Sequence, residues 1–285
     1  MTDRQVTQLI RALEVTEGAG VTVHRTLGTP ARRHLDPFLM LDHISSDDPD
    51  DYVAGFPEHP HRGFNTFTYM LEGHMRHGDS MGNKGDLGPG GAQWMKAASG
   101  VIHSEMPQQV EGSMRGFQLW INLPAQEKMS DPAYQEIRPE SVPEIINEHQ
   151  RIRLLAGSYQ GRSGPVVDPH TQAQILDITL PQGAGLTHKL PNEHNALVYV
   201  FEGSARIAES NIPQHHLAVL SAGETVQISA GENGARFLLI AGRPLGEPIV
   251  QHGPFVMNSR EEIEQAMADY RDGKLVRNKA SMVQG

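Results

Sequence analysis

Apolar and polar residues alternate in short runs along most of the chain, which is the pattern of half-buried β-strands. The clearest runs in the first half are residues 20–27, 66–71 and 116–124, the last of which ends at a proline. The region between the second and third runs contains many glycines, at positions 73, 78, 82, 85, 88, 90 and 91. Because closely spaced glycines favour turns, the first half is predicted to consist of short strands joined by hairpins.

The second half shows the same pattern. Its β-type segments are separated by Gly, Pro and Asn and cover residues 152–155, 174–180, 196–201, 205–208, 217–220, 225–228 and 235–241. Such regular spacing is typical of a sandwich or barrel. Residues 69–73 (YMLEG) match residues 199–203 (YVFEG) in type and order, so a duplicated β-barrel is the simplest interpretation.

The chain ends differently. Ser259 and Glu262 form a capping-box pattern, and Ile263, Met267 and Tyr270 follow at helical spacing, which predicts a helix near 259–272. Such a helix is expected to pack on the outside of a barrel, and 279–285 is expected to be a loose tail. We place an N-terminal domain at 1–134, a linker rich in Pro, Glu and Asp at 135–147, and a C-terminal domain at 148–285.

Composition narrows the function. The chain has 285 residues, a net charge of −10 and no cysteine. Without a basic block, direct binding to nucleic acid or to an anionic membrane is not expected. No apolar run approaches the ~20 residues of a membrane-spanning helix, and the N-terminus carries charges where a signal peptide would be apolar. The absence of cysteine excludes disulfides and thiolate metal sites, and it fits a cytoplasmic location.

Two short clusters contain side chains that can bind metal: His59-Pro60-His61 and His103-Ser104-Glu105. Residues i and i+2 of a strand point to the same face, so two adjacent strands would bring three imidazoles and one carboxylate together. This mixed set suits Fe(II), Mn(II), Ni(II) or Cu(II), and four ligands on an octahedral ion leave two positions open. From spacing alone, exposed strand histidines and a charged loop glutamate remain an equal alternative.

Other polar residues are weaker candidates. His188, Glu193 and His194 have the wrong spacing for a second metal site, so hydrogen-bonding roles are expected. Arg62 could pair with a carboxylate, contact substrate, or be an ordinary surface charge. Three more histidines could orient a ligand imidazole, although plain loop or rim histidines are the favoured interpretation: His43, His74 and His77.

Several long stretches together resemble the pirins, a family of bicupin proteins in the cupin superfamily. They are DPFLMLD at 36–42, HPHRGF at 59–64, QWM at 93–95, GVIHSEM at 100–106, QLWINLP at 118–124 and GPFVMN at 253–258. The resemblance implies an all-β fold of two cupin (jelly-roll) β-barrels in tandem with a short C-terminal helix. It also implies one iron, bound in the N-terminal domain only, with His59, His61, His103 and Glu105 as ligands.

The resemblance further implies a dioxygenase of the quercetin 2,3-dioxygenase type. Its substrates would be a small aromatic chelating molecule, such as a flavonol, and dioxygen; its cofactor would be Fe(II), with Mn, Ni, Cu or Zn substitution allowed. Glu105 would act as the catalytic base. One position departs from the pattern: the general cupin motif, and many pirins, place a glutamate where this chain has Asn65.

A different class of function is also compatible with the resemblance. The protein could be a non-enzymatic, iron-bearing and redox-sensitive regulator that binds a protein partner, as eukaryotic pirins are regarded. A third alternative is that the metal only stabilises the barrel. Turnover of a flavonol by the purified protein would separate the enzyme from both alternatives.

Overall fold

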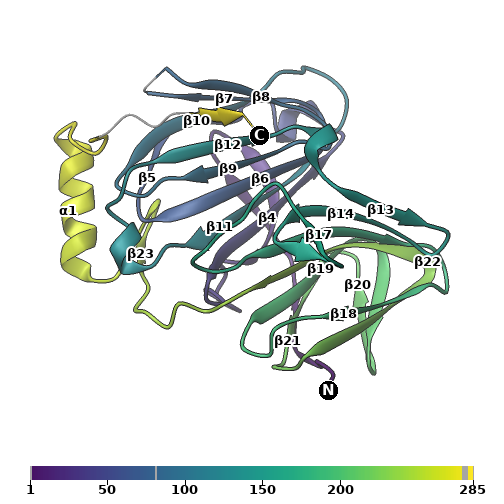
Figure 1. The fold of residues 1–285 in the computed structure, drawn as a ribbon. Coiled ribbons are helices and arrows are strands. Elements are labelled where there is room, and N and C mark those ends of the chain that lie inside the picture. Colours follow the sequence, from purple (N-terminus) through teal and green to yellow (C-terminus); the bar gives the residue numbers. More distant parts are fainter. Residues whose placement is uncertain (1, 81, 278–281, 285) are drawn as a thin grey trace. The chain divides into compact units, whose positions relative to one another are not determined.

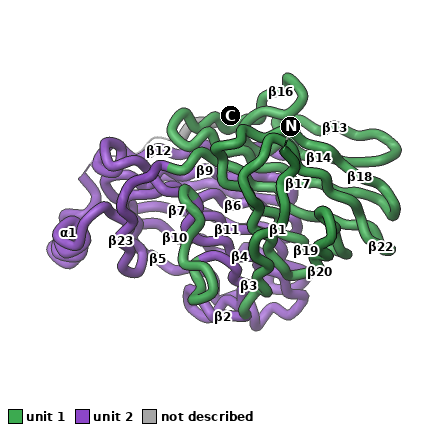
Figure 2. The backbone as a smooth tube through the Cα atoms, turned by 90° about the horizontal axis from the view of Figure 1, so that it is seen from below, with its two compact units in different colours: residues 1–13, 28–37, 140–244 green, residues 14–27, 38–139, 245–285 purple. Residues whose placement is uncertain are grey.

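The structure is a computed structural model that describes residues 2–80, 82–277 and 282–284 (Figure 1). The chain forms two compact units, coloured separately in Figure 2. Unit 1 comprises residues 1–13, 28–37 and 140–244, and unit 2 comprises residues 14–27, 38–139 and 245–285. Among the described residues, no helix is both long and apolar enough to cross a membrane.

Unit 2 contains an eight-stranded and a four-stranded sheet. The larger sheet has the order β2 (Leu13–Glu17), β3 (Val21–Leu27), β4 (Phe38–Ser46), β11 (Met114–Asn122), β6 (Phe64–Glu72), β9 (Ala92–Lys96), β12 (Ala133–Ile137) and β25 (Met282–Gln284). The smaller sheet has the order β5 (Phe56–His61), β10 (Val101–Pro107), β7 (Met75–Asp79) and β8 (Lys84–Leu87).

The two sheets of unit 2 share a hydrophobic core. Met75 and Leu87 of the smaller sheet belong to the same buried cluster as Ile44, Met70 and Met114 of the larger one. Alternation along each strand turns one set of side chains toward this core. The sheets therefore pack face to face as a β-sandwich, in which polar residues on the inner faces can also meet.

Unit 1 is built around one nine-stranded sheet, whose core includes Leu154, Ile178, Val198, Val226 and Phe237. Its main order is β1 (Val6–Arg11), β21 (His216–Leu220), β19 (Asn195–Ile207), β22 (Thr225–Gly242), β17 (Gln174–Leu180), β14 (Gln150–Ala156) and β13 (Glu144–Asn147), with β18 (Gly185–Lys189) on β22 and β20 (Ser210–Pro213) on β19.

Short elements complete the two units. Two small hairpins pair β15 (Ser158–Tyr159) with β16 (Arg162–Ser163) and β23 (Val250–His252) with β24 (Phe255–Met257). Within the described ranges, single-turn 3₁₀ helices lie at η1 (Pro49–Asp51), η2 (Ala125–Glu127) and η3 (Pro139–Ser141).

The C-terminal helix confirms the sequence prediction. Helix α1 spans Arg260–Arg271, and Ser259 and Glu262 form the expected capping box. Its buried residues Ile263 and Ala266 pack with Phe255 and Met257 of β24. Of the predicted stripe formed by Ile263, Met267 and Tyr270, only Ile263 is buried, because Met267 and Tyr270 are each 43% exposed.

The chain is divided differently from the expected boundaries. The segment 135–147, expected to be a linker, contains the end of β12, helix η3 and strand β13. Residues 1–13 group with the later half of the chain, and 245–285 with the earlier half. Most of the tail expected at 279–285 lies outside the described residues, although β25 pairs in parallel with β12.

One glycine of the HPHRGF stretch is required by a close approach. Gly63 has φ +92°, and a Cβ at this position would overlap the carbonyl oxygen of Val256. Any larger residue would therefore push the turn after β5 away from β24.

Candidate metal centre

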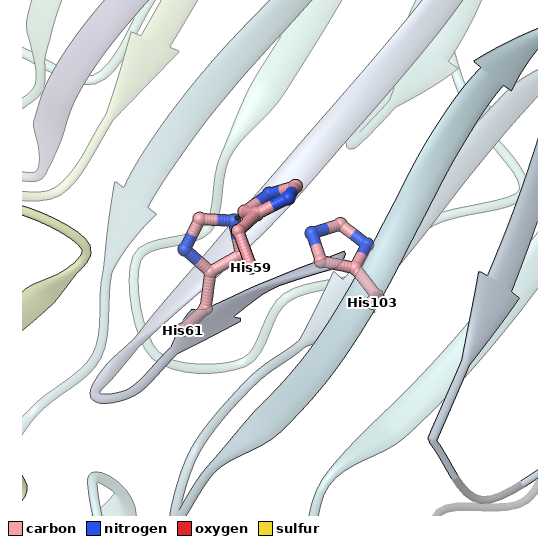
Figure 3. Close-up of side chains that lie close together, drawn as sticks. All are labelled: His59, His61 and His103. Atoms are coloured by element: carbon pink, nitrogen blue, oxygen red, sulfur yellow. Dashed lines mark hydrogen bonds between the residues drawn. The ribbon is translucent and has the colours of Figure 1, made fainter. Parts of the chain in front are cut away.

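Three histidines of unit 2 converge on the inner face of the smaller sheet. His59 and His61 lie on β5, and His103 lies on β10 directly opposite His59 in the antiparallel register. One ring nitrogen of each lies within 4.8 Å of the others (Figure 3). His61 and His103 are buried, whereas His59 is half-buried, so the cluster is accessible beside His59.

The spacing of two of these nitrogens fits a shared ion. Nε2 of His59 lies 3.0 Å from Nε2 of His61. Two imidazole nitrogens bound at about 2.1 Å to one ion, at right angles to each other, would be separated by ~3.0 Å. The pair is therefore already at the separation expected of neighbouring ligands.

The contacts of the Nδ1 atoms of His59 and His103 determine which ring nitrogen of each residue can bind an ion. Nδ1 of His59 lies 2.7 Å from the carbonyl oxygen of Pro57, which can only accept, so Nδ1 carries the proton and Nε2 keeps its lone pair. Nδ1 of His103 lies 3.3 Å from Nδ1 of His77. Nε2 of His103 is buried and has no hydrogen-bond partner in the described part of the chain. A buried nitrogen left in this way is suited to bind a metal.

Burial favours the uncharged imidazoles of His61 and His103. Burial lowers the pKa of His61 well below its usual value; His59 lowers it further, and a backbone interaction with Pro254 opposes both. Burial likewise lowers the pKa of His103, with contributions from His61, His59 and His77. Metal ligation requires the neutral imidazole, so these shifts favour binding at neutral pH.

Glu105 lies beside the cluster, two residues after His103 and past a break in the strand register. Its carboxylate is buried and accepts hydrogen bonds from the larger sheet: Thr68 Oγ1 lies 3.0 Å from Oε1, and Gln118 Nε2 lies 2.9 Å from Oε2. Burial raises the pKa of Glu105, while His59, Thr68 and Gln118 lower it. Glu105 is not part of the group with ligand atoms within 4.8 Å, so the structure brings together three of the four predicted ligands.

Sequence reasoning missed Thr68 and Gln118. The two residues face each other across β6 and β11, and Thr68 Oγ1 also lies 2.7 Å from Gln118 Oε1. Alternation along each strand could have placed both on an inner face. That they meet Glu105 depends on how the two sheets pack, which no local pattern shows.

The remaining polar residues singled out in the sequence lie in different environments. His77 contacts His103, His74 is exposed, and His43 stacks on Phe117 with ring centroids 4.6 Å apart. Arg62 is buried and pairs with Asp269. Asn65 is buried on β6, where the general cupin motif has a carboxylate.

The C-terminal histidines make hydrogen bonds within unit 1. Nε2 of His188 lies 2.6 Å from Oε1 of Gln174, and Nε2 of His194 lies 3.3 Å from Oε1 of Gln172. A carbonyl oxygen accepts, so both histidines carry a proton on Nε2. Burial lowers the pKa of His188 to about 4.

Two β-rich units in one chain, with a histidine cluster on an inner sheet face of one of them, are the architecture of a bicupin protein. The family profile for Pirin matches residues 20–121, and the profile for the Pirin C-terminal cupin domain matches residues 175–276. The chain belongs to the pirin family.

Several relatives are similar over nearly the whole chain. A Pseudomonas aeruginosa protein named "Putative quercetin 2,3-dioxygenase" is 51% identical over 95% of this chain and 98% of its own length. Human pirin is 40% identical over 95% of this chain and 93% of its own length. The crystal structure of quercetin 2,3-dioxygenase from Acinetobacter baumannii superposes with a TM-score of 0.90 at 32% identity, covering 96% of this chain and 98% of that one.

Proposed function

We propose that the protein is a metal-dependent dioxygenase of the quercetin 2,3-dioxygenase type, acting on a flavonol-like chelating substrate. The observation that carries the proposal is the position of Glu105, a buried carboxylate beside three convergent imidazoles. A metal that only stabilised the barrel would need no base beside it, and the Glu105 carboxylate can act as one. The names of the relatives support the same reaction class.

His59, His61 and His103 would hold the metal, for which we propose Fe(II), one per chain, with Glu105 as a fourth ligand. A bound Fe(II) would polarise the chelating oxygens of the substrate and lower the pKa of its hydroxyl group. Three neutral imidazoles leave coordination positions for such a substrate. The half-buried side of the cluster at His59 is where the substrate would enter.

Glu105 would accept the proton of the substrate hydroxyl. When Glu105 is ionised, Thr68 donates to Oε1 and Gln118 donates to Oε2. When Oε1 is protonated, it can donate to Thr68 Oγ1, and the Thr68 hydroxyl can turn its own hydrogen to Gln118 Oε1, 2.7 Å away. The three side chains thus satisfy both protonation states of the base without moving a heavy atom.

The wall beside His61 is aromatic. Trp120 and Phe64 contact the His61 ring in T-shaped arrangements, with centroids 5.2 Å and 5.1 Å away. Such surfaces favour a flat aromatic ligand. Phe64 is fully buried, so a planar flavonol bound at the cluster would meet the partly exposed ring of Trp120 on one side and Glu105 as a base.

The test is oxygen uptake with quercetin by the iron-loaded protein, compared with Glu105→Gln at equal iron content. Loss of a general base should lower turnover by a factor on the order of 10² or more. Oxygen uptake by the wild type that Glu105→Gln retains in full would remove Glu105 as the base. Absence of turnover in the iron-loaded wild type would reject the dioxygenase proposal.

A further inference from the structure

His77 is a buried histidine on β7 that contacts the candidate metal centre from outside. Strand β10 lies between β5 and β7, so His103 has the histidines of β5 on one side and His77 on the other. The rings of His77 and His103 have centroids 5.0 Å apart, and their Nδ1 atoms are 3.3 Å apart. Both side chains are almost completely buried, His77 at 2% and His103 at 1% exposure.

Two Nδ1 atoms at this distance share one proton, because one must donate and the other must accept. If His77 donates, the proton of neutral His103 lies on Nε2, and that nitrogen cannot bind a metal. If His103 donates, its Nε2 has a free lone pair. Figure 3 shows one ring nitrogen of His103 turned toward His59 and His61. Metal binding at this nitrogen thus requires His77 to be the acceptor.

The arrangement has a cost at His77. As the acceptor it carries its own proton on Nε2, which is buried and makes no hydrogen bond with the residues that the structure describes, so metal binding at His103 has to offset an unpaired buried donor. Its ring packs in a T-shaped contact against Tyr134, with centroids 4.9 Å apart. The polar contact of this buried ring is therefore made by Nδ1, and its partner is Nδ1 of His103.

We propose that His77 is a positioning residue for the metal centre, whose Nδ1 accepts the Nδ1 proton of His103 and keeps Nε2 of His103 free for the metal. The proposal rests on metal binding by the histidine cluster. Outer hydrogen-bond partners of this kind fix the tautomer and the ring orientation of a ligand histidine.

The first test is the tautomer of His103 in the metal-free wild type, read from ¹⁵N chemical shifts and long-range ¹H–¹⁵N couplings of the labelled protein. We expect the proton of His103 on Nδ1 and that of His77 on Nε2. A His103 protonated on Nε2 would overturn the proposal, whatever metal the protein binds and whether or not it is an enzyme.

The second test is metal affinity, measured with Fe(II) and Zn(II) by competition against a chelator. His77→Phe retains an aromatic ring but removes the acceptor, and it should weaken binding by about 10- to 100-fold. His77→Gln, whose amide oxygen can accept the same proton, should recover part of that loss. His74→Phe is the matched control, because His74 is exposed at the start of the same hairpin.

The outcomes separate this inference from the proposed function. Wild type that binds neither metal would reject the metal centre itself. Wild-type affinity in a folded His77→Phe would reject the role of His77 and leave the centre intact. If His77→Phe does not fold, the tautomer measurement still decides the question, since it uses the wild-type protein.

Discussion

Arg62 and Asp269 form a buried ion pair, with 2.8 Å between Nη1 and Oδ2. Arg62 directly follows His61 at the end of β5, and Asp269 lies on helix α1. The Arg62 guanidinium also donates to the carbonyl oxygens of Ser99, at 2.7 Å, and Leu275, at 3.4 Å. The strand that supplies two of the three clustered histidines is thereby tied to the last helix of the chain.

Removal of one partner of this ion pair should lower the stability of the fold. Asp269→Ala leaves the Arg62 charge buried without its partner and should lower the free energy of unfolding by about 3–5 kcal/mol. Glu264→Ala is a suitable control, because Glu264 pairs with Arg260 on the exposed face of the same helix. Urea unfolding should show a change within about 0.5 kcal/mol for the control. Equal effects of the two substitutions would contradict a special role for the buried pair.

Metal binding should depend on the three clustered histidines and not on the histidines of unit 1. His59→Ala, His61→Ala and His103→Ala should each lose the metal that the wild type holds at about one per chain. His188→Ala and His194→Ala should retain it, since the Nε2 atoms of these two histidines are hydrogen-bonded to glutamine side chains. Metal analysis of the purified variants gives the answer. Metal retained in His59→Ala and lost in His188→Ala would reverse the assignment.

Thr68 should affect turnover more than metal affinity. Thr68→Val keeps the shape of the side chain but removes the hydroxyl that bonds to Glu105. A hydrogen bond to a charged group contributes about 1.5–3 kcal/mol, so turnover of quercetin should fall by roughly 10- to 100-fold. Thr66→Val removes a buried hydroxyl from the same strand and serves as the control. Unchanged turnover in Thr68→Val would remove Thr68 from the proposed proton path.

Acid should destabilise unit 1 through His188. Burial lowers the pKa of His188 to about 4, below its ordinary value of 6.5. As pH falls, the unfolded chain takes up this proton first, so stability is complete above about 6.5 and is lost between 6.5 and 4. His188→Gln should lose less stability over this range, by up to about 3 kcal/mol.

The comparison uses urea unfolding of the metal-free proteins at pH 7 and pH 4.5. Other buried histidines titrate in both proteins, so only the difference between wild type and variant reports on His188. A variant whose stability falls as steeply as that of the wild type would show that the fold does not lower the pKa of His188.

Part of the centre could be predicted from local spacing. His59, His61 and His103 follow from two i, i+2 patterns and the expectation that their strands are neighbours. The register that places His103 opposite His59 is consistent with that expectation. Glu105 has the same spacing, but the register break after His103 and the bonds to Thr68 and Gln118 determine its position.

The residues around the centre could not be predicted in the same way. The sequence offers His77 as a residue that could orient a ligand imidazole but favours a plain loop or rim histidine, because its contact with His103 depends on how the β7 hairpin pairs with β10. The sequence leaves three roles open for Arg62, because its carboxylate partner lies 207 residues later in the chain. The periodicity of a strand predicts the face on which a residue lies, but it does not predict which distant side chain packs against that face.

The division of the chain between the two units also has a consequence for synthesis. Unit 2 contains the clustered histidines and also residues 245–285, so it is not complete until those residues have been synthesised. The intervening residues 140–244 of unit 1 emerge first. A nascent chain that stops before Asp269 already contains His59, His61 and His103, but its Arg62 lacks the Asp269 carboxylate with which it pairs in the fold. We therefore expect metal loading to follow synthesis of residues 245–285, and truncation before Asp269 to yield protein without metal.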